Sequence, residues 1–201
     1  RVLIPRPETE EVAGVAIEFA RAVEGDRTVI DLGTGSGAIG LSLAMELPLD
    51  GTSVWMTDVS ADALAVAQAN LAGIGRSARN VTVVESRWFD DVPDELRADV
   101  IVSNPPYIAS NSPQVDRSVD QHEPSIALYS GLDGLDAIRE IVENAGNYLK
   151  ANGVLVLEIG FNQADAVREV LEKHGYGDIE IRTDVFGNDR IAIGRWRTGA
   201  A

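Results

Sequence analysis

Short apolar runs alternate with segments of helical periodicity along most of this chain. Runs rich in Val, Ile and Leu are typical of buried parallel strands, whereas apolar residues three or four positions apart are typical of amphipathic helices. The pattern predicts strands over 28–32, 53–57, 81–84, 99–103, 154–159, 178–183 and 190–196, and helices from Pro7 up to Gly25 and over 38–47, 61–72, 135–149 and 163–174.

This alternation predicts an α/β fold. Strands that alternate with helices form a mostly parallel sheet with helices on both faces. A turn at 186–189 joins the last two predicted strands, which we therefore expect to close the sheet as an antiparallel pair. The chain contains no internal repeat, low-complexity tract or interdomain linker, so we expect one Rossmann-like domain over residues 1–201, with a seven-stranded sheet.

The most informative stretch is V-I-V-S-N-P-P-Y-I, residues 100–108. Pro105 and Pro106 prevent both helix and ladder pairing, so the chain must leave the sheet there in a stiff, extended conformation. The Asn104 amide, the Pro105 carbonyl and the Tyr107 ring are thereby placed at a strand's carboxyl end, where open α/β sheets bind ligands. Two oxygen acceptors and an aromatic face suit a planar –NH2 group, although a purely structural turn is the alternative.

A second candidate site is the glycine-rich segment after the first predicted strand. Residues 35–40, G-S-G-A-I-G, fit the dinucleotide-binding pattern, whereas residues 33–37, G-T-G-S-G, fit the turn with which methyltransferases bind S-adenosylmethionine. Under both interpretations the backbone approaches the ligand closely, and Asp58 after the second strand accepts hydrogen bonds from ribose hydroxyls. Trp88, after the third strand, is either a cover for the adenine or a core residue.

Features outside the glycine segment favour the methyltransferase interpretation. An NAD-dependent oxidoreductase needs a polarising His, Lys or Tyr at its hydride site, and no residue in a motif of this sequence is a candidate for that role. A methyltransferase that acts on nitrogen needs a holder for the nucleophile, which Asn104–Tyr107 supply. Residues 109–130 are polar and aperiodic, as expected for a long loop that serves as a lid or binding surface.

The composition of the chain excludes several classes of function. The formal net charge is −15, and such a chain is repelled by phosphate backbones, so we expect no stable nucleic-acid binding. The chain has no cysteine and two histidines, which argues against a metal site.

No apolar run approaches membrane-spanning length and no signal peptide is apparent, so we expect a cytoplasmic protein. Because the chain starts at Arg1 without a methionine, we expect an upstream part.

With both motifs placed, the chain resembles the release factor glutamine N5-methyltransferases along nearly all of its length. The Asn-Pro-Pro-Tyr motif alone is shared with DNA adenine methyltransferases, whereas R-P-E-T-E and E-P-x-x-A-L make the family resemblance specific. The matching segments are L-I-P-R-P-E-T-E at 3–10, V-I-D-L-G-T-G-S-G-A-I-G at 29–40, V-S-N-P-P-Y-I at 102–108, H-E-P-S-I-A-L at 122–128, G-L-D-G-L-D at 131–136, L-E-I-G at 157–160 and D-x-x-G-x-D-R at 184–190.

The resemblance implies a class I methyltransferase that uses S-adenosylmethionine to methylate the glutamine of the Gly-Gly-Gln motif in peptide chain release factors. It also implies an upstream helical domain that helps to grip the release factor. Arg87 stands where relatives commonly carry Asp, and His122 where Phe is usual. By resemblance the cofactor contacts are Gly33, Thr34, Gly35, Ser36, Gly37, Asp58, Trp88 and Asn104, and the glutamine contacts are Asn104, Pro105, Pro106 and Tyr107.

The residues at this turn favour catalysis by positioning. A carboxamide nitrogen is a poor nucleophile, and the sequence offers no strong base to deprotonate it. We expect Asn104 Oδ1 and the Pro105 carbonyl to accept the two amide protons while Tyr107 restrains the amide plane. Asp31 is predicted to orient the glycine turn through backbone N–H groups. An adenine N6-methyltransferase, with the same –NH2 chemistry, and a nucleotide-binding oxidoreductase or module are the alternatives.

Overall fold

The computed structural model describes residues 6–110 and 128–197. Its sheet has seven strands in the order β3-β2-β1-β4-β5-β7-β6, and β7 runs antiparallel to both of its neighbours. The strands are β1 (Arg27–Leu32), β2 (Thr52–Asp58), β3 (Val81–Glu85), β4 (Ala98–Ser103), β5 (Leu149–Glu158), β6 (Tyr176–Thr183) and β7 (Asp189–Trp196). The predicted mostly parallel sheet with a C-terminal antiparallel pair is confirmed.

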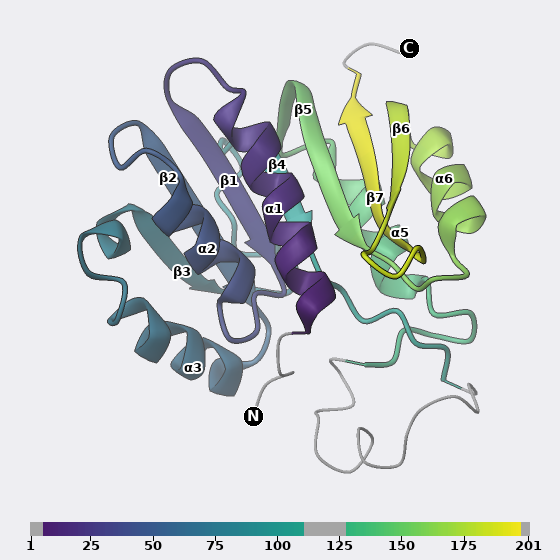
Figure 1. Cartoon of the computed structure of the whole chain (residues 1–201), viewed down its shortest axis with the longest axis horizontal. Helices are drawn as coiled ribbons and strands as arrows, with labels where there is room; N and C mark the ends of the chain where they lie inside the picture. Colours follow the sequence, from purple (N-terminus) through teal and green to yellow (C-terminus); the bar gives the residue numbers. More distant parts are fainter. Residues whose placement is uncertain (1–5, 111–127, 198–201) are drawn as a thin grey trace.

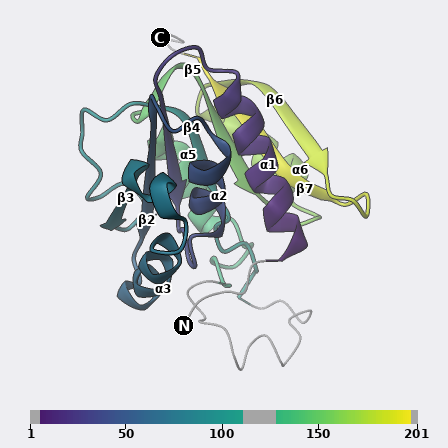
Figure 2. The ribbon, with the colours of Figure 1, turned by 60° about the vertical axis from the view of Figure 1, so that its left-hand side comes forward.

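Helices cover both faces of this sheet (Figures 1 and 2), as predicted. Alternate strand residues belong to two separate cores, with Val29 facing α1 and α2 and Ile30 facing α5 and α6. Such alternation follows from the two-residue period of a strand. The helices are α1 (Pro7–Arg21), α2 (Ala38–Glu46), α3 (Ala61–Leu71), α5 (Asp136–Ala145) and α6 (Ala164–Lys173), with a short 3-10 helix η1 (Gly75–Asn80) before β3.

Local signals explain where the first helices begin. Pro7 occupies the first turn of α1, with Glu8 and Glu10 near the positive end of the helix dipole. The Ser60 hydroxyl accepts a hydrogen bond of 3.2 Å from the Ala63 N–H and so caps α3. The prediction of these helix starts from proline and cap residues is therefore confirmed.

One predicted helix extends into the strand that follows it. The helix expected over 135–149 begins at Asp136 and ends at Ala145, and Leu149 is instead the first residue of β5. Gly146 ends the helix, and the Tyr148 carbonyl accepts a 2.7 Å hydrogen bond from the N–H of Ala98 in β4. The side chain of Leu149 is buried in the same core as α5, which is why its apolar character matched the helical period.

Candidate active site

Four strands end level with one another at the edge where the candidate site lies. Leu32 of β1 pairs with Thr57 of β2 and with Ser103 of β4, and Ser103 pairs with Leu157 of β5. The hydroxyl of Ser103 donates a 2.7 Å hydrogen bond to the Leu32 carbonyl, which ties the two central strand ends together. The next residue of each strand or connection therefore emerges at this edge: Gly33, Asp58, Asn104 and Glu158.

This edge also contains the point where the strand order reverses. The chain proceeds outward from β1 through β2 to β3, and then returns to place β4 on the other side of β1. Open α/β sheets bind ligands at such a switch point, outside the carboxyl ends of the strands. The glycine segment after β1 and the Asn-Pro-Pro-Tyr segment after β4 thus flank one site.

The glycine segment makes a tight turn that depends on its glycines. Gly33, Gly35 and Gly37 have φ values of 66°, 57° and 86°, which other residues rarely adopt. The Thr34 N–H donates to the Thr57 carbonyl at 2.8 Å, so the turn is attached to the end of β2. The result is an exposed backbone at the start of α2, the arrangement in which helix N-termini receive anionic or polar ligand groups.

Two carboxylates hold this turn. Asp31 Oδ2 accepts hydrogen bonds from the Thr34 hydroxyl at 2.6 Å and the Gly40 N–H at 2.8 Å, so Asp31 holds the turn as predicted, but through a hydroxyl of the turn and a backbone N–H of α2 rather than through backbone N–H groups of the turn itself. Complete burial raises the pKa of Asp31 to about 6. Asp58 accepts from the Gly35 N–H with Oδ2 and from the Ser60 N–H with Oδ1, both at 2.9 Å, which fixes its carboxylate beside the turn.

A cavity of about 460 Å³ opens between the two segments. Its mainly apolar wall includes Ile39, Ala63 and the Trp88 ring, and Trp88 packs against Gly33, where an added Cβ would lie 3.3 Å from the indole. Of the cofactor contacts predicted from the sequence, the cavity brings together Gly33, Thr34, Gly35, Ser36, Asp58, Trp88 and Asn104. Gly37 lies behind this lining, where a Cβ would contact Leu41 and Met56.

An ion pair stands at the rim of the cavity. Arg87 Nη2 lies 2.8 Å from Glu140 Oε2 of α5, and the Arg87 side chain is 63% exposed. The Glu140 carboxylate holds the pKa of Arg87 above its ordinary value through this hydrogen bond. Arg87 thus directs its guanidinium toward α5, and Glu140 brings a second charged group to the cavity wall.

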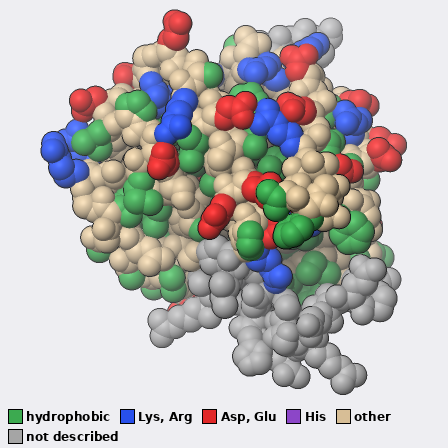
Figure 3. Space-filling model, viewed as in Figure 1, with side chains coloured by type: hydrophobic (Ala, Val, Ile, Leu, Met, Phe, Trp, Pro, Cys, Tyr) green, Lys and Arg blue, Asp and Glu red, His purple; other side chains and the backbone are tan. Residues whose placement is uncertain are grey.

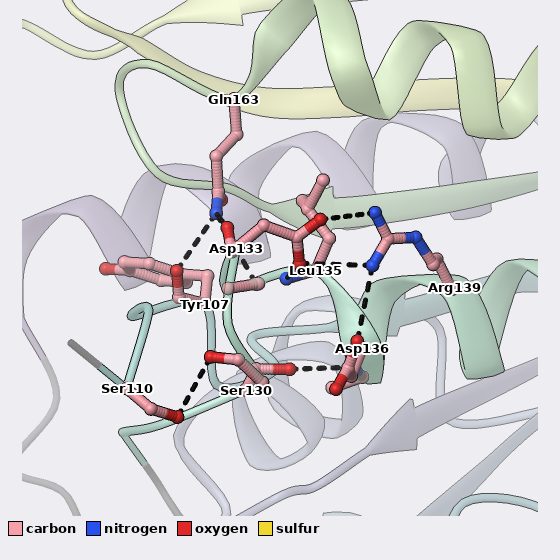
Figure 4. A network of polar contacts seen from close by, with 11 residues as sticks. Tyr107, Ser110, Ser130, Asp133, Leu135, Asp136, Arg139 and Gln163 are labelled. Atoms are coloured by element: carbon pink, nitrogen blue, oxygen red, sulfur yellow. Dashed lines mark hydrogen bonds and ion pairs between the residues drawn. The ribbon is translucent and has the colours of Figure 1, made fainter. Parts of the chain in front are cut away.

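The Asn-Pro-Pro-Tyr segment is held by contacts from three elements. Asn104 Nδ2 donates to Thr9 Oγ1 of α1 at 3.2 Å, and the Tyr107 hydroxyl donates to Glu158 Oε1 at 3.2 Å. Gln163 Nε2 donates to the backbone carbonyl of Tyr107 at 3.0 Å (Figure 4). Pro105 is buried, whereas Pro106 lines the cavity beside Asn104.

Sequence reasoning assigned no role to Glu158, although its position is notable. This residue ends a continuous apolar strand, V-L-V-L-E, and its side chain is only 1% exposed. Its Oε2 accepts from the Thr9 hydroxyl at 3.3 Å. Burial raises the pKa of Glu158 to about 7, and the hydrogen bond from Tyr107 and the charge of Arg190 oppose that rise. A lone acid at the end of an otherwise apolar strand was the available signal.

The predicted lid falls mostly outside the described residues, which also exclude His122 and Glu123. The described ends of the segment meet. The Ile108 N–H donates to the Leu128 carbonyl at 3.0 Å, and the Ser130 N–H donates to the Ile108 carbonyl at 2.9 Å. A parallel bridge joins Ile108 and Tyr129, and Tyr129 and Ser130 line the cavity, so the segment starts and returns beside the site.

Acidic and basic side chains of the described residues are interspersed on the face shown in Figure 3, and these residues form no basic stripe there. None of the described helices is long and apolar enough to cross a membrane. Within residues 6–110 and 128–197, no group of three or more His, Asp or Glu side chains is arranged to hold a metal ion.

Comparison with known proteins agrees with this architecture. Residues 18–121 match the family model described as "Methyltransferase small domain". Release factor glutamine methyltransferases of Pasteurella multocida and Neisseria gonorrhoeae are 39% and 42% identical over 97% of the chain, which spans 68% and 69% of their lengths. The crystal structure of a release factor-specific protein-(glutamine-N5) methyltransferase from Alicyclobacillus acidocaldarius is 29% identical, with a TM-score of 0.58 over 96% of this chain and 94% of that one.

A more distant structure shares the fold. A 16S rRNA methyltransferase of T. thermophilus, solved in complex with AdoMet and guanosine, is 20% identical and gives a TM-score of 0.67 over 96% of this chain and 44% of that one. At this identity the similarity establishes the common architecture alone. The match to the methyltransferase family model and to the glutamine methyltransferase structure identifies the fold as that of a class I methyltransferase.

Proposed function

This chain belongs to the family of release factor glutamine methyltransferases, and on that premise we propose that it methylates the side-chain nitrogen of a release factor glutamine. The proposed methyl donor is S-adenosylmethionine, and the proposed target is the glutamine of a Gly-Gly-Gln motif. The observation that supports this best is the level ending of β1, β2 and β4, which places Asn104 against the same cavity as Gly33 and Asp58.

The residues around the cavity fit S-adenosylmethionine. Gly33 and Gly35 adopt positive φ values, which glycine tolerates. Because they carry no side chains, a ligand is able to approach the backbone beside the cavity closely. The Asp58 carboxylate is held at the end of β2, where it is able to accept hydrogen bonds from ribose hydroxyls. The apolar wall formed by Ile39, Ala63 and Trp88 suits an adenine ring. When bound, the cofactor supplies a methyl group on a positively charged sulfur.

The Asn-Pro-Pro-Tyr segment would hold the glutamine amide by accepting its hydrogens. Because Asn104 donates through Nδ2 to Thr9, its Oδ1 is the acceptor available to the substrate side. The Pro105 carbonyl would accept the second N–H, and Tyr107 would restrain the amide plane. In the transfer, a C–N bond forms, the S–C bond breaks with its electron pair left on sulfur, and the nitrogen then releases one proton to water.

These acceptors assist because the nitrogen gains positive charge as the C–N bond forms. Oxygen acceptors aimed at its hydrogens then bind more strongly than in the ground state, which lowers the barrier. Orientation of the nitrogen along the axis of the breaking bond supplies a further part of the rate. No step needs a base strong enough to deprotonate an amide.

The protein substrate agrees with the charge of the chain. The net charge of −15 disfavours association with DNA or RNA, and so argues against the adenine N6 alternative that shares the –NH2 chemistry. Since release factors act in translation termination, the proposal places the reaction in the cytoplasm.

The decisive experiment supplies tritiated S-adenosylmethionine to the purified chain with a release factor that carries either Gln or Ala in its Gly-Gly-Gln loop. Label on the Gln form alone is the expected result. Label on both forms, or on neither while calorimetry shows cofactor binding, contradicts the proposal. Duplex DNA in a parallel reaction tests the adenine alternative, for which label on DNA is the distinguishing result.

A further inference from the structure

We propose that Glu158 is a positioning residue for the methyl transfer: through Thr9 its carboxylate sets the orientation of the Asn104 amide, and it directly fixes the Tyr107 ring. The residue has no direct place in the cavity lining, so it would act through its neighbours. The inference rests on the function proposed above and adds to it the group that determines which atom of Asn104 faces the substrate.

The contacts form one connected chain. Asn104 Nδ2 lies 3.2 Å from Thr9 Oγ1, and Thr9 Oγ1 lies 3.3 Å from Glu158 Oε2. The other carboxylate oxygen, Oε1, lies 3.2 Å from the hydroxyl of Tyr107. Glu158 therefore joins the end of β5 to α1 and to both polar side chains of the Asn-Pro-Pro-Tyr segment.

An ionised carboxylate determines the direction of every bond in this chain, because it is only able to accept. The hydroxyls of Thr9 and Tyr107 must then donate their hydrogens to Glu158. Thr9 has used its hydrogen, so toward Asn104 it presents lone pairs, and only the Nδ2 end of the amide is able to bond there. Asn104 Oδ1 is consequently the atom left to accept the substrate N–H.

A protonated Glu158 would relax this constraint. It would carry a hydrogen of its own, and one of the two hydroxyls would have to accept it. If Thr9 accepts, the Thr9 hydrogen becomes free to point at Asn104, which favours Oδ1 toward Thr9 and Nδ2 toward the cavity. An –NH2 group would then face the –NH2 group of the substrate, and the acceptor would be lost.

The surroundings of Glu158 make its ionisation sensitive to pH near neutrality. Burial raises its pKa to about 7. The Arg190 guanidinium on β7, which lies 3.5 Å from Asp184, lowers that pKa, as do the hydroxyls of Tyr107 and Thr9, whereas the Glu8 carboxylate on α1 raises it. Among the described residues, Arg6 at the start of α1 is a further charged group near this network, and its charge acts on the neighbouring Tyr107.

A purely structural link would not need this carboxylate. Ionised groups are costly to bury, and a neutral glutamine of the same length is able to join the same two hydroxyls. A glutamine, however, has one donor group and one acceptor, so it does not force both hydroxyls to donate. The bond direction that the carboxylate imposes thus gives a reason for an acid, rather than a glutamine, at this buried strand end.

The first test compares turnover of E158Q, T9V and T9S with wild type, and E169Q, which neutralises an exposed acid on α6, controls for the loss of one negative charge. E158Q and T9V should lower kcat at least about tenfold, as expected for loss of an aligned polar contact at a transition state, while cofactor Kd changes less than about twofold. T9S keeps the hydroxyl and should retain most activity. The kcat of wild type should fall below about pH 7, whereas E158Q should show no such fall.

The second test measures the protonation of the hydrogen-bond network by NMR, without substrate or cofactor. In protein labelled with 15N at asparagine, and with the Asn104 signal assigned from N104A, the side-chain amide should shift with a midpoint near pH 7 in wild type and show no midpoint there in E158Q. An unresponsive Asn104 amide, or E158Q with the turnover and pH profile of wild type, overturns the inference. If wild type fails to methylate any glutamine, the proposed function fails, and the amide titration still decides the role of Glu158.

Discussion

The backbone carbonyl of Tyr107 accepts a 3.0 Å hydrogen bond from the side chain of Gln163, which lies 56 positions further along the chain. The same amide accepts from the Gly160 N–H through its oxygen at 2.8 Å. Gln163 therefore links the segment after β5 to the turn after β4. Figure 4 shows its contact with Tyr107. Tyr107 is thus held at its backbone by Gln163 and at its hydroxyl by Glu158.

Replacement of Gln163 by Leu should loosen this turn. The substitution leaves the Tyr107 carbonyl without its partner, and a buried unsatisfied group costs about 1–3 kcal/mol. We expect urea unfolding to show a loss of that size, together with a kcat about three- to tenfold lower because Tyr107 shifts. Q68L, on the exposed face of α3, is the control. Unchanged kcat in a destabilised Q163L protein would show that the contact serves stability alone.

Gly134 should be intolerant of substitution for a related reason. Its φ is 80°, and a Cβ there would lie 2.3 Å from the Tyr107 carbonyl oxygen. An alanine pays about 1–2 kcal/mol for the left-handed conformation and must also displace the carbonyl. We expect G134A to lower both the unfolding free energy and kcat. Gly14 on α1 has no atom within 4 Å of its added Cβ, so G14A should be neutral or stabilising by about 0.5–1 kcal/mol.

Asn104→Ala tests the acceptor that the mechanism needs most. Removal of one aligned polar contact at a transition state costs about a hundredfold or more in turnover, and we expect that loss in kcat. The cofactor Kd, measured by calorimetry, should change much less than kcat. N162A, at an exposed position after β5, should leave turnover unchanged. Equal turnover of N104A and wild type would contradict the role of this side chain.

The architecture was predictable from the sequence to the extent that periodicity and caps determine it. The strand before Asn104 and the glycine turn after β1 needed only a buried apolar run and residues that end it. The prediction that a helix reaches Leu149 was wrong because an apolar residue in the sequence fits a buried helix and a buried strand equally well. Only pairing with Ala98, a distant residue, decides between the two.

The residues of the candidate site were predictable where a single sequence motif contains them. They were less predictable where the site depends on contacts between distant segments. The glycine turn, Asp58 and Asn104 each lie at the carboxyl end of a strand, so parallel pairing was enough to bring them to one edge. Glu158 and Thr9 lie 149 positions apart, and their hydrogen bond depends on how α1 packs across the end of β5. Neither periodicity nor motif spacing contains that information.

Asp58→Ala should weaken cofactor binding. The substitution removes the carboxylate proposed to hold the ribose and also frees the Gly35 N–H from a 2.9 Å hydrogen bond. Hydrogen bonds to charged groups contribute about 1.5–3 kcal/mol each, which corresponds to an increase in Kd of about ten- to a hundredfold. Calorimetry with S-adenosylmethionine measures this change, and D62A, at an exposed position in the first turn of α3, is the control. A Kd within about twofold of wild type would remove Asp58 from the cofactor site.

Glu158→Gln should stabilise the protein increasingly as pH rises, even though it lowers turnover. In the wild type, burial raises the pKa of Glu158 from 4.5 to about 7, so the folded state holds a proton that the unfolded state releases. This contribution to stability is complete below pH 4.5 and is lost as pH rises through 7. At about 1.4 kcal/mol per pKa unit, the full loss is about 3 kcal/mol.

The glutamine variant does not titrate, and Asp31 titrates in both proteins and cancels. The difference in unfolding free energy between E158Q and wild type should therefore grow by about 2.5 kcal/mol between pH 5 and pH 8, as urea denaturation at several pH values would show. E169Q should show no such trend. A difference that stays constant with pH would mean that burial does not raise the pKa of Glu158, so that the carboxylate is ionised over this whole range and the expected fall of wild-type kcat below about pH 7 has no basis.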